Sequence, residues 1–314
     1  MQDSVIGTDT RLVISTAPHV SDEESVSGIM YGVVIAMLPA LVASLYFFRF
    51  RALWLVIVTS AACVLTEYVF QTVRGKPITI YDGSALVTGM LLAFNFPPTL
   101  PAWMAVVGGV VAMALGKHVF GGLGSNPFNP ALVGRAFLVT AFPIAMTSWT
   151  SPIDGIATAT PLALMKMEGI ATNYWQLFVG SVGGCLGETS ALAILIGGIY
   201  LIYKNYIDWR IPAGYLATVG VLAVAFGHDP LFHWLAGGLM LGAFFMATDM
   251  VTTPITRKGR WMFGIGAGVI LMVIRLWGAY PEGVTFSILL MNGFTPLIDR
   301  LTRPRCYGEV KANA

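Results

Sequence analysis

The stretch Ser84-Ala-Leu-Val-Thr-Gly-Met-Leu-Leu-Ala-Phe94, followed directly by Asn95-Phe-Pro-Pro98, decides the fold class of this chain. Its apolar residues predict a helix, and the two prolines end that helix. The segment is too short for a simple membrane span, which needs about 20 residues. A short apolar helix that stops at prolines is typical of discontinuous membrane helices, whose free backbone groups face a protein-lined cavity.

The composition of the whole chain agrees with a membrane protein. Of 314 residues, 56% are hydrophobic and only 11% are charged, and the mean hydropathy is +0.75; soluble domains carry about 25% charged residues. We therefore expect an all-α polytopic membrane protein with about ten transmembrane helices, some of them broken or half-length. The apolar segments are 29–47, 53–70, 84–94, 102–115, 131–145, 190–203, 212–226, 231–247, 261–278 and 284–298. The stretch 175–186 either extends the sixth helix or forms a separate half-helix.

The positions of Lys and Arg predict the orientation in the membrane. With ten spans and a cytoplasmic N-terminus, 14 of the 18 basic residues, Lys117 and Arg135 among them, fall on the cytoplasmic side, as the positive-inside rule requires. Arg49 and Arg51 are the clear exception. We expect a cytoplasmic N-terminal segment (1–28), one transmembrane domain (29–300) and a cytoplasmic tail (301–314). The loop 146–174 then lies on the outer face.

Two internal echoes bear on a possible inverted repeat. Asp82-Gly-Ser-Ala-Leu86 and Glu188-Thr-Ser-Ala-Leu192 both begin apolar segments and start on opposite sides of the membrane in this topology, as an inverted repeat requires. Gly134-Arg135 and Gly259-Arg260 form a second echo. Both copies of the second echo lie on the same side, so this one does not support inversion.

Several classes of function are excluded by what the chain lacks. The net charge is +2 and no run of basic residues suggests nucleic acid. The cysteines Cys63, Cys185 and Cys306 have no C-x-x-C spacing, and no two histidines stand four residues apart. We therefore expect no disulfide framework, and no iron–sulfur, zinc or haem site.

The polar stretch Asp154-Gly-Ile-Ala-Thr-Ala-Thr160-Pro161-Leu162 is unusual in so apolar a chain. Thr160 is placed to cap a short helix that begins at Pro161 and runs through Lys166. The same geometry offers a second interpretation, because the free N–H groups and positive dipole of a helix N-terminus can hold a phosphate beside the Thr160 hydroxyl. Local sequence alone favours the simple cap.

A glycine-rich run, Gly121-Gly122-Leu-Gly124-Ser-Asn126-Pro-Phe-Asn129-Pro130, leads into a helix that carries Arg135. We expect a tight turn with Asn129 as the helix cap. Such a loop exposes N–H groups that could bind a phosphate or the polar edge of a ring, but it is equally compatible with a structural turn at the membrane interface. It lacks the Lys-Ser/Thr of a P-loop and follows no strand, which argues against nucleotide hydrolysis.

Four acidic residues lie within or beside apolar segments and are candidates for an ion path: Glu67, Asp82, Glu188 and Asp249. Carboxylates within a membrane are functional hypotheses by default. Glu67 is the most deeply embedded, whereas the others stand at segment ends, where capping a helix or facing water is the alternative.

Taken together, the motifs resemble one family. The motifs, in chain order, are Thr16-Ala-Pro-His19, Asp82 to Pro98, Gly121 to Leu138, Asp154 to Leu162 and Gly187 to Leu192. They are similar to the D component of Rnf ion-translocating oxidoreductase complexes, a family that includes the B component of the sodium-pumping NADH:quinone reductase. The resemblance covers about Ser15 to Arg303, and the short N-terminus favours the Rnf branch.

The resemblance implies a covalent FMN, joined through its phosphate to a threonine in a motif Asp-x-x-Ser/Thr-x-Ala-Thr. Asp154, Ala159 and Thr160 match this motif; Ala157 departs from it, and Thr158 beside it is an alternative acceptor. A flavin transferase would attach the group by phosphoryl transfer from FAD. A second, noncovalent flavin, riboflavin, is also implied, and we expect the run from Gly121 to Arg135 to form part of its lining.

The implied function is electron relay within a redox-driven pump in the bacterial cytoplasmic membrane. The complex would couple ferredoxin and NAD to Na⁺ or H⁺ movement, with the Rnf components A, B, C, E and the flavin-bearing G as partners. Alternatives are a component of a quinone-reducing sodium pump, a secondary transporter of a small polar solute, or an anchor that positions redox partners.

Overall fold

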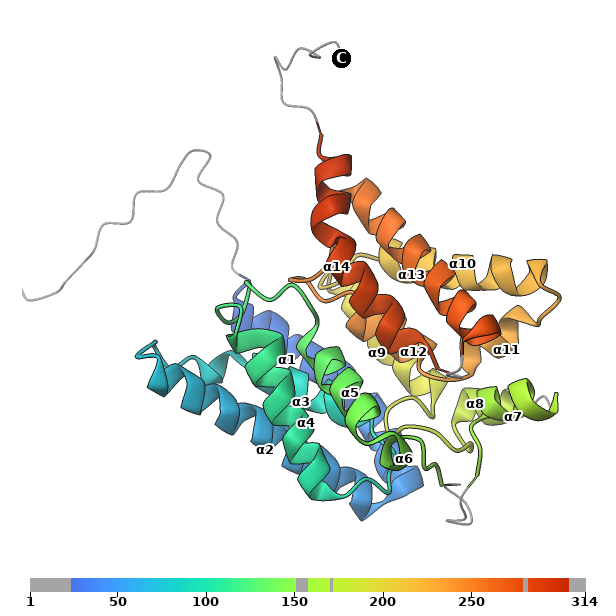
Figure 1. Ribbon diagram of the computed structural model, residues 1–314, viewed down its shortest axis with the longest axis horizontal. Helices are drawn as coiled ribbons and strands as arrows, with labels where there is room; N and C mark the ends of the chain where they lie inside the picture. Colours follow the sequence, from blue (N-terminus) through green and yellow to red (C-terminus); the bar gives the residue numbers. More distant parts are fainter. Residues whose placement is uncertain (1–23, 151–157, 170–171, 279–281, 305–314) are drawn as a thin grey trace, which may run out of the picture.

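The computed structural model describes residues 24–150, 158–169, 172–278 and 282–304, and every regular element in these ranges is a helix (Figure 1). Helices α1 to α6 occupy one side of the molecule in Figure 1, and α10 to α14 occupy the other. The helices are α1 (Val26–Phe48), α2 (Phe50–Val73), η1 (Ile80–Asp82), α3 (Ser84–Phe94), α4 (Ala102–Met113), η2 (Ala114–His118), α5 (Pro130–Ala141), α6 (Pro143–Met146), α7 (Pro161–Glu168), α8 (Tyr174–Val179), α9 (Ala191–Tyr203), α10 (Arg210–Ala225), α11 (Pro230–Leu235), α12 (Leu239–Leu241), η3 (Gly242–Met246), α13 (Arg257–Trp277) and α14 (Val284–Thr302).

The all-helical, membrane-type class is confirmed, while the number of spans is only partly supported. In the described ranges, α1, α2 and α13 are long and apolar enough to cross a membrane; α3, α4 with η2, α5, α9 and α10 are shorter apolar helices. The segment 231–247 is not one helix, as its hydropathy suggested, but is divided into α11, α12 and η3. Gly237 causes one of these breaks, because its φ of +73° lies in the left-handed region that favours glycine.

The prolines after α3 produce the predicted break, and a second irregular segment packs against it. The chain between α8 and α9 pairs with the end of α3: Leu186 N donates to Phe96 O (3.0 Å) and Gly187 N donates to Phe94 O (2.9 Å). These bonds pair backbone groups that have no partner within a helix. Such pairing is what allows irregular backbone inside a membrane protein. The stretch 175–186 therefore does not extend the sixth helix. Helix α8 covers only its first part, and the remainder is irregular.

The two halves of the first sequence echo run in opposite directions. The C-terminal end of α3 meets the segment just before α9, while Ser84 at the start of α3 and Leu201 near the end of α9 line one pocket at the opposite end. The helices are therefore antiparallel, as inversion would require. The second echo, Gly134-Arg135 and Gly259-Arg260, also has a structural counterpart. Its two copies lie in helices α5 and α13, which begin after the N-caps Asn129 and Thr256. Each of these helices follows a loop that is preceded by a π-helical turn, η2 or η3.

Small residues allow the helices to approach closely. A Cβ on Gly89 of α3 would lie 2.5 Å from Ser60 Cα of α2, and a Cβ on Gly197 of α9 would lie 2.0 Å from Ala36 O of α1. Backbone contact of this kind is how membrane helices gain packing energy where burial from water contributes little. It accounts for part of the high glycine content of the chain.

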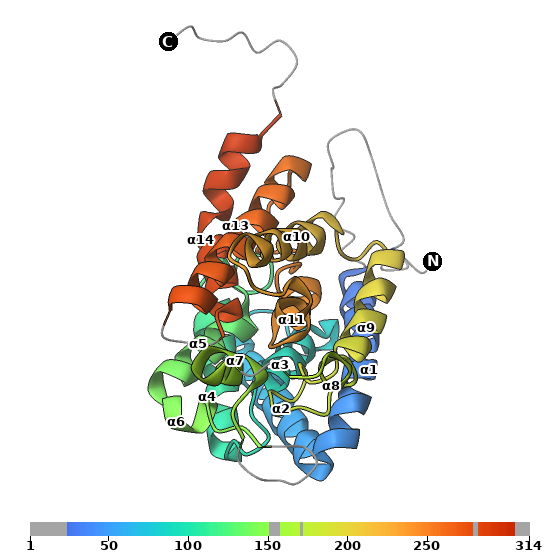
Figure 2. The ribbon, with the colours of Figure 1, turned by 90° about the vertical axis from the view of Figure 1, so that its right-hand side faces the viewer.

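The short helices α6, α7 and α8 gather at one end of the bundle, opposite the C-terminal end of α14 (Figure 2). Helix α7 is fastened to the end of α13, because Lys166 Nζ donates to Arg275 O (3.0 Å) and Gly278 O (2.5 Å). This end carries Thr160 and is called the Thr160 end below. The opposite end, which carries Asn129, is called the Asn129 end.

Candidate functional site

The turn before α7 has the predicted local structure. Thr160 Oγ1 accepts a hydrogen bond from Ala163 N (3.2 Å), and Pro161 is the first helical residue. Thr160 is only 2% exposed, whereas Thr158 and Ala159 are exposed. The capping prediction is confirmed, but the hydroxyl is less accessible than an acceptor on an open loop would be. Asp154 and Ala157 lie outside the described residues.

A pocket adjoins this turn at the Thr160 end. Its walls come from α5, from the segment after α6, from the turn itself and from the start of α14. The residues that line it are Arg135, Val139, Met146, Thr147, Trp149, Thr158, Ala159, Thr160, Ala163, Glu282, Thr285 and Phe286. The pocket therefore combines hydroxyls, a cation, an acid and aromatic rings beside a helix N-terminus.

Arg135 connects this pocket to the helix break. It lies in α5, and its side chain donates to Asn95 Oδ1 at the end of α3 and, through Nη2, to Glu282 Oε2 (2.7 Å). The residue is 6% exposed. Arg135 therefore lines the pocket at the Thr160 end, whereas Asn126 and Asn129 of the preceding loop line a different pocket.

The irregular segment before α9 brings an acid into the same cluster. Cys185 N donates to Glu188 Oε1 (3.0 Å), and the Cys185 thiol donates to Asn95 O (3.2 Å). Glu188 is 6% exposed. Ligand atoms of Cys185, Glu188 and Glu282 lie within 4.8 Å of one another. The helix break thus brings Glu282 next to Cys185 and Glu188, which lie far before it in the sequence.

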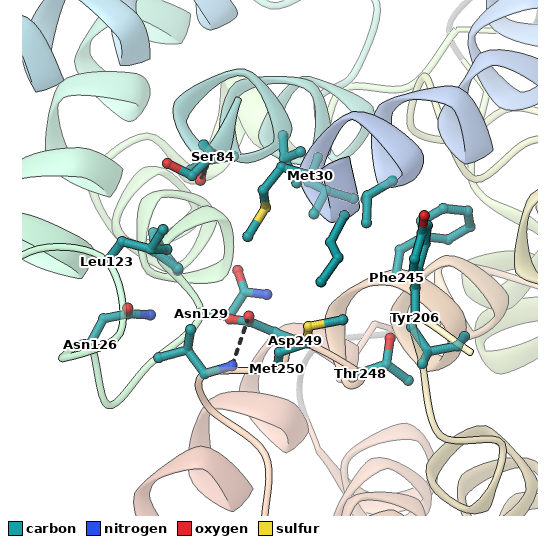
Figure 3. Close-up of a pocket in the computed structure, with 18 of the residues that line it drawn as sticks. Met30, Ser84, Leu123, Asn126, Asn129, Tyr206, Phe245, Thr248, Asp249 and Met250 are labelled. Carbon is teal, nitrogen blue, oxygen red and sulfur yellow. Dashed lines mark hydrogen bonds between the residues drawn. The ribbon is translucent and has the colours of Figure 1, made fainter. Parts of the chain in front are cut away.

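A second pocket lies at the Asn129 end (Figure 3). Asn126, Asn129 and Leu123 from the glycine-rich run line it, together with Asp249 and Thr248 from the loop after η3. Asp249 accepts a hydrogen bond from Val251 N (3.3 Å). The predicted cap is confirmed, since Asn129 Oδ1 accepts from Ala131 N (3.0 Å).

The glycines of this run shape the loop but do not line the pocket. Gly121, Gly122 and Gly124 have φ values of +126°, +115° and +89°, a range that other residues adopt only with strain. Arg74 donates to His118 O, and Lys76 Nζ donates to Gly121 O (2.8 Å). These contacts fix the turn and so position Asn126 and Asn129.

Two of the four candidate acids belong to one buried chain of hydrogen bonds. Lys117 Nζ donates to Glu67 Oε1 (2.6 Å) and to Ser84 Oγ (2.7 Å), and Ser84 Oγ donates to Asp82 Oδ1 (2.6 Å). The side chains of Glu67 and Lys117 are 1% and 2% exposed. Lys117 is therefore not a loop residue, as its place in the charge count implied. The π-helical turn η2, a feature frequent at functional sites, directs it inward.

The four acids do not form one path by direct contact. Glu67 and Asp82 share the buried chain, Asp249 lies in the pocket at the Asn129 end, and Glu188 lies at the helix break. Sequence patterns missed Lys117 and Glu282 as members of these clusters. The isolated acid Glu282, next to Pro281 in the sequence, was the available signal for the latter.

Comparison with known proteins identifies the family of this chain. Residues 13–308 match the sequence profile described as the NQR2, RnfD, RnfE family. The chain belongs to this family. It is 51% identical over 309 residues, covering 96% of this chain and 97% of the relative, to the D component of the Na(+)-translocating ferredoxin:NAD(+) oxidoreductase complex of Acetobacterium woodii.

Two further family members give the same picture. The D component of the proton-translocating ferredoxin:NAD(+) oxidoreductase complex of Clostridium ljungdahlii is 48% identical over 316 residues, covering 94% of this chain and 96% of the relative. The D component of the ion-translocating oxidoreductase complex of Stutzerimonas stutzeri is 42% identical over 328 residues, covering 91% of this chain and 93% of the relative. The resemblance read from the motifs is confirmed. Relatives of nearly equal similarity are named for different ions.

Proposed function

We propose that this chain is the D component of an Rnf-type, redox-driven ion pump and relays electrons through an FMN esterified to Thr160. The complex then couples ferredoxin and NAD chemistry to Na⁺ or H⁺ movement across the bacterial cytoplasmic membrane. The observation that carries the proposal is the placement of Thr160 at the capped start of α7, in the wall of a pocket that also contains Arg135 and Trp149. The partners are the Rnf components A, B, C, E and G.

The residues at the Thr160 end fit a phosphate-linked flavin. The N-terminus of α7 favours a negative charge there, Arg135 balances the charge of Glu282 in the same pocket, and Trp149 offers an aromatic face for a ring system. FMN, when bound, supplies the redox chemistry, while the protein supplies position and electrostatics. Because Thr160 is buried and Thr158 is exposed, the transferase reaches Thr160 only when the turn 158–161 opens or before it closes.

The pocket at the Asn129 end is our candidate for the second flavin, riboflavin. The amides of Asn126 and Asn129, with the backbone of the loop, can pair with the polar edge of an isoalloxazine ring. The apolar residues Leu91, Phe244 and Phe245 would cover the rest of the ring. In the expected orientation this pocket faces the cytoplasm and Thr160 faces outward, so the two flavins would lie on opposite sides of the membrane.

The flavin assignment is tested by producing the full chain together with the flavin transferase and examining it on a denaturing gel. We expect a fluorescent band whose fluorescence is lost in Thr160→Val and kept in the matched control Thr158→Val. The peptide with residues 158–166 should carry the mass of FMN. A nonfluorescent wild-type band contradicts the proposal, and loss of fluorescence in Thr158→Val alone moves the attachment to Thr158.

A further inference from the structure

A polar pocket lies next to the pocket at the Asn129 end and takes no part in the proposed flavin sites. It is formed by the connection between α9 and α10, the loop after η3 and the start of α13. Tyr206 and Thr248 line both pockets. The charged residues of its lining are Asp208, Arg210 and Arg260, so the lining contains two cations and one anion.

Both arginines are bonded to the same carboxylate. Arg210 Nη1 donates to Asp208 Oδ2 (2.8 Å), and Arg260 Nη1 donates to the same oxygen (2.5 Å). Because one carboxylate balances only one guanidinium, the lining keeps an excess positive charge. The Nη2 groups of Arg210 and Arg260 make no hydrogen bond with the described residues. The two side chains are 25% and 32% exposed, so these donors remain accessible to a ligand.

The charges around the pocket do not cancel this excess. Lys204 follows the last turn of α9, and Arg257 and Lys258 begin α13; all three are exposed and have no ion-pair partner in the described part of the chain. Two acids stand nearby. Asp249 lies between two residues that line the pocket, and Asp299 accepts a hydrogen bond from the backbone N–H of another. The three surrounding cations outnumber these two acids.

The rim of the pocket is apolar and aromatic. The rings of Trp209 and Trp261 meet edge to face, with centroids 5.7 Å apart, and the Arg210 guanidinium lies 5.2 Å from the Trp209 ring centroid. Trp209 is 50% exposed and Ile255 is 81% exposed. Tryptophan is enriched where a membrane meets water. A ligand that enters here therefore meets cationic donors and apolar surface together.

We propose that this pocket binds the phosphate of an anionic phospholipid headgroup. The planar fork of a guanidinium matches the geometry of a phosphate, and basic pockets between membrane helices on the cytoplasmic side bind anionic headgroups. In the expected orientation this pocket faces the cytoplasmic leaflet. The Nη2 groups of Arg210 and Arg260 donate to the phosphate, and the acyl chains cover Trp209 and Ile255. A soluble phosphate would share the first contact but would leave this apolar rim uncovered.

The test measures lipid binding to the purified full chain in neutral detergent by native mass spectrometry. The probes are phosphatidylglycerol, which is anionic, and phosphatidylcholine with the same acyl chains, which has no net charge. We expect the wild type to bind phosphatidylglycerol more tightly. Arg210→Gln/Arg260→Gln should weaken that binding by about 30-fold, since two cations are lost. The control Arg49→Gln/Arg51→Gln removes two exposed arginines between α1 and α2 and should leave it unchanged.

A second pair of variants leaves the arginines in place. Ile255 is exposed and lines the pocket, so Ile255→Glu adds a negative charge there with little effect on packing, and Ile255→Gln is its uncharged match. We expect Ile255→Glu to bind phosphatidylglycerol about fivefold more weakly than Ile255→Gln does. This comparison decides the question if the arginine variant does not fold.

Three results overturn the proposal. The first is equal binding of the two lipids by the wild type. The second is equal binding of phosphatidylglycerol by Ile255→Glu and Ile255→Gln, and the third is an equal loss in the arginine variant and its control. Glycerol 3-phosphate, added at the same concentration as the lipid, should not displace phosphatidylglycerol. Displacement would identify a soluble phosphate as the ligand and overturn the choice of a lipid.

Discussion

The buried pair of Glu67 and Lys117 gives the sharpest prediction about stability. Lys117→Met removes the donor to Glu67 Oε1 and to Ser84 Oγ while keeping an unbranched side chain of similar length. Glu67 is then left with Gln71 Nε2 at 3.2 Å as its described hydrogen-bond partner, and its Oε2 has none. The change therefore leaves a nearly fully buried carboxylate without its cation.

The expected cost follows from that burial. Removing one partner of a buried ion pair costs about 3–5 kcal/mol of stability, whereas replacing both partners by uncharged groups of similar volume often leaves the stability almost unchanged. For a chain of this size we expect the apparent Tm of Lys117→Met in detergent to fall by on the order of 10 °C. The double variant Glu67→Gln/Lys117→Met should recover most of this loss.

The measurement is thermal unfolding of the purified full chain in detergent at neutral pH, followed by tryptophan fluorescence for the wild type, both single variants and the double variant. This cycle isolates the interaction between the two side chains. If Lys117→Met lowers the Tm no more than an exposed substitution such as Lys258→Met does, or if the double variant shows the sum of the two single losses, the buried pair does not form as described.

Two further predictions concern packing and the Asn129 end. Gly89→Ala would place a Cβ 2.5 Å from Ser60 Cα. Because the backbone must move, we expect the free energy of unfolding to fall by about 1–3 kcal/mol. The Tm should be lower than that of the control Gly122→Ser, where the added side chain meets no neighbour within 4 Å although the backbone φ is positive. Burial would raise the pKa of Asp208, but hydrogen bonds from Arg210 and Arg260 hold it below its ordinary value. A lowered carboxyl pKa stabilises the fold above the unfolded pKa of about 3.9 and loses that effect as pH falls through the folded value. Asp208→Asn should therefore cost about 0.2–1 kcal/mol near pH 7. The difference from wild type should begin to shrink as pH falls below about 4 and disappear once pH is below the lowered pKa of folded Asp208; a constant difference across this range would contradict the ion-pair explanation.

The local features of both sites were readable from the sequence because they depend on residues close together in the chain. Thr160-Pro161 and Asn129-Pro130 each combine a capping side chain with a residue that fits the first helical position, and both cap as expected. The break after α3 was also readable, because Pro97 and Pro98 directly follow the end of the helix and cannot continue it. Hydropathy was less informative at 231–247, where it could not register that Gly237 interrupts the helix.

The sequence by itself determined that this is an all-helical membrane protein, where helices α5 and α7 start and α3 ends, and which family it belongs to, because composition, capping and motif order are properties of the linear chain. Only the tertiary structure decided which charges meet. Arg135 pairs with Glu282, 147 residues later in the chain, and Lys117 pairs with Glu67 from another helix. In a membrane protein a buried charge must find its partner wherever the packing of helices provides one, and no spacing along the chain records that choice.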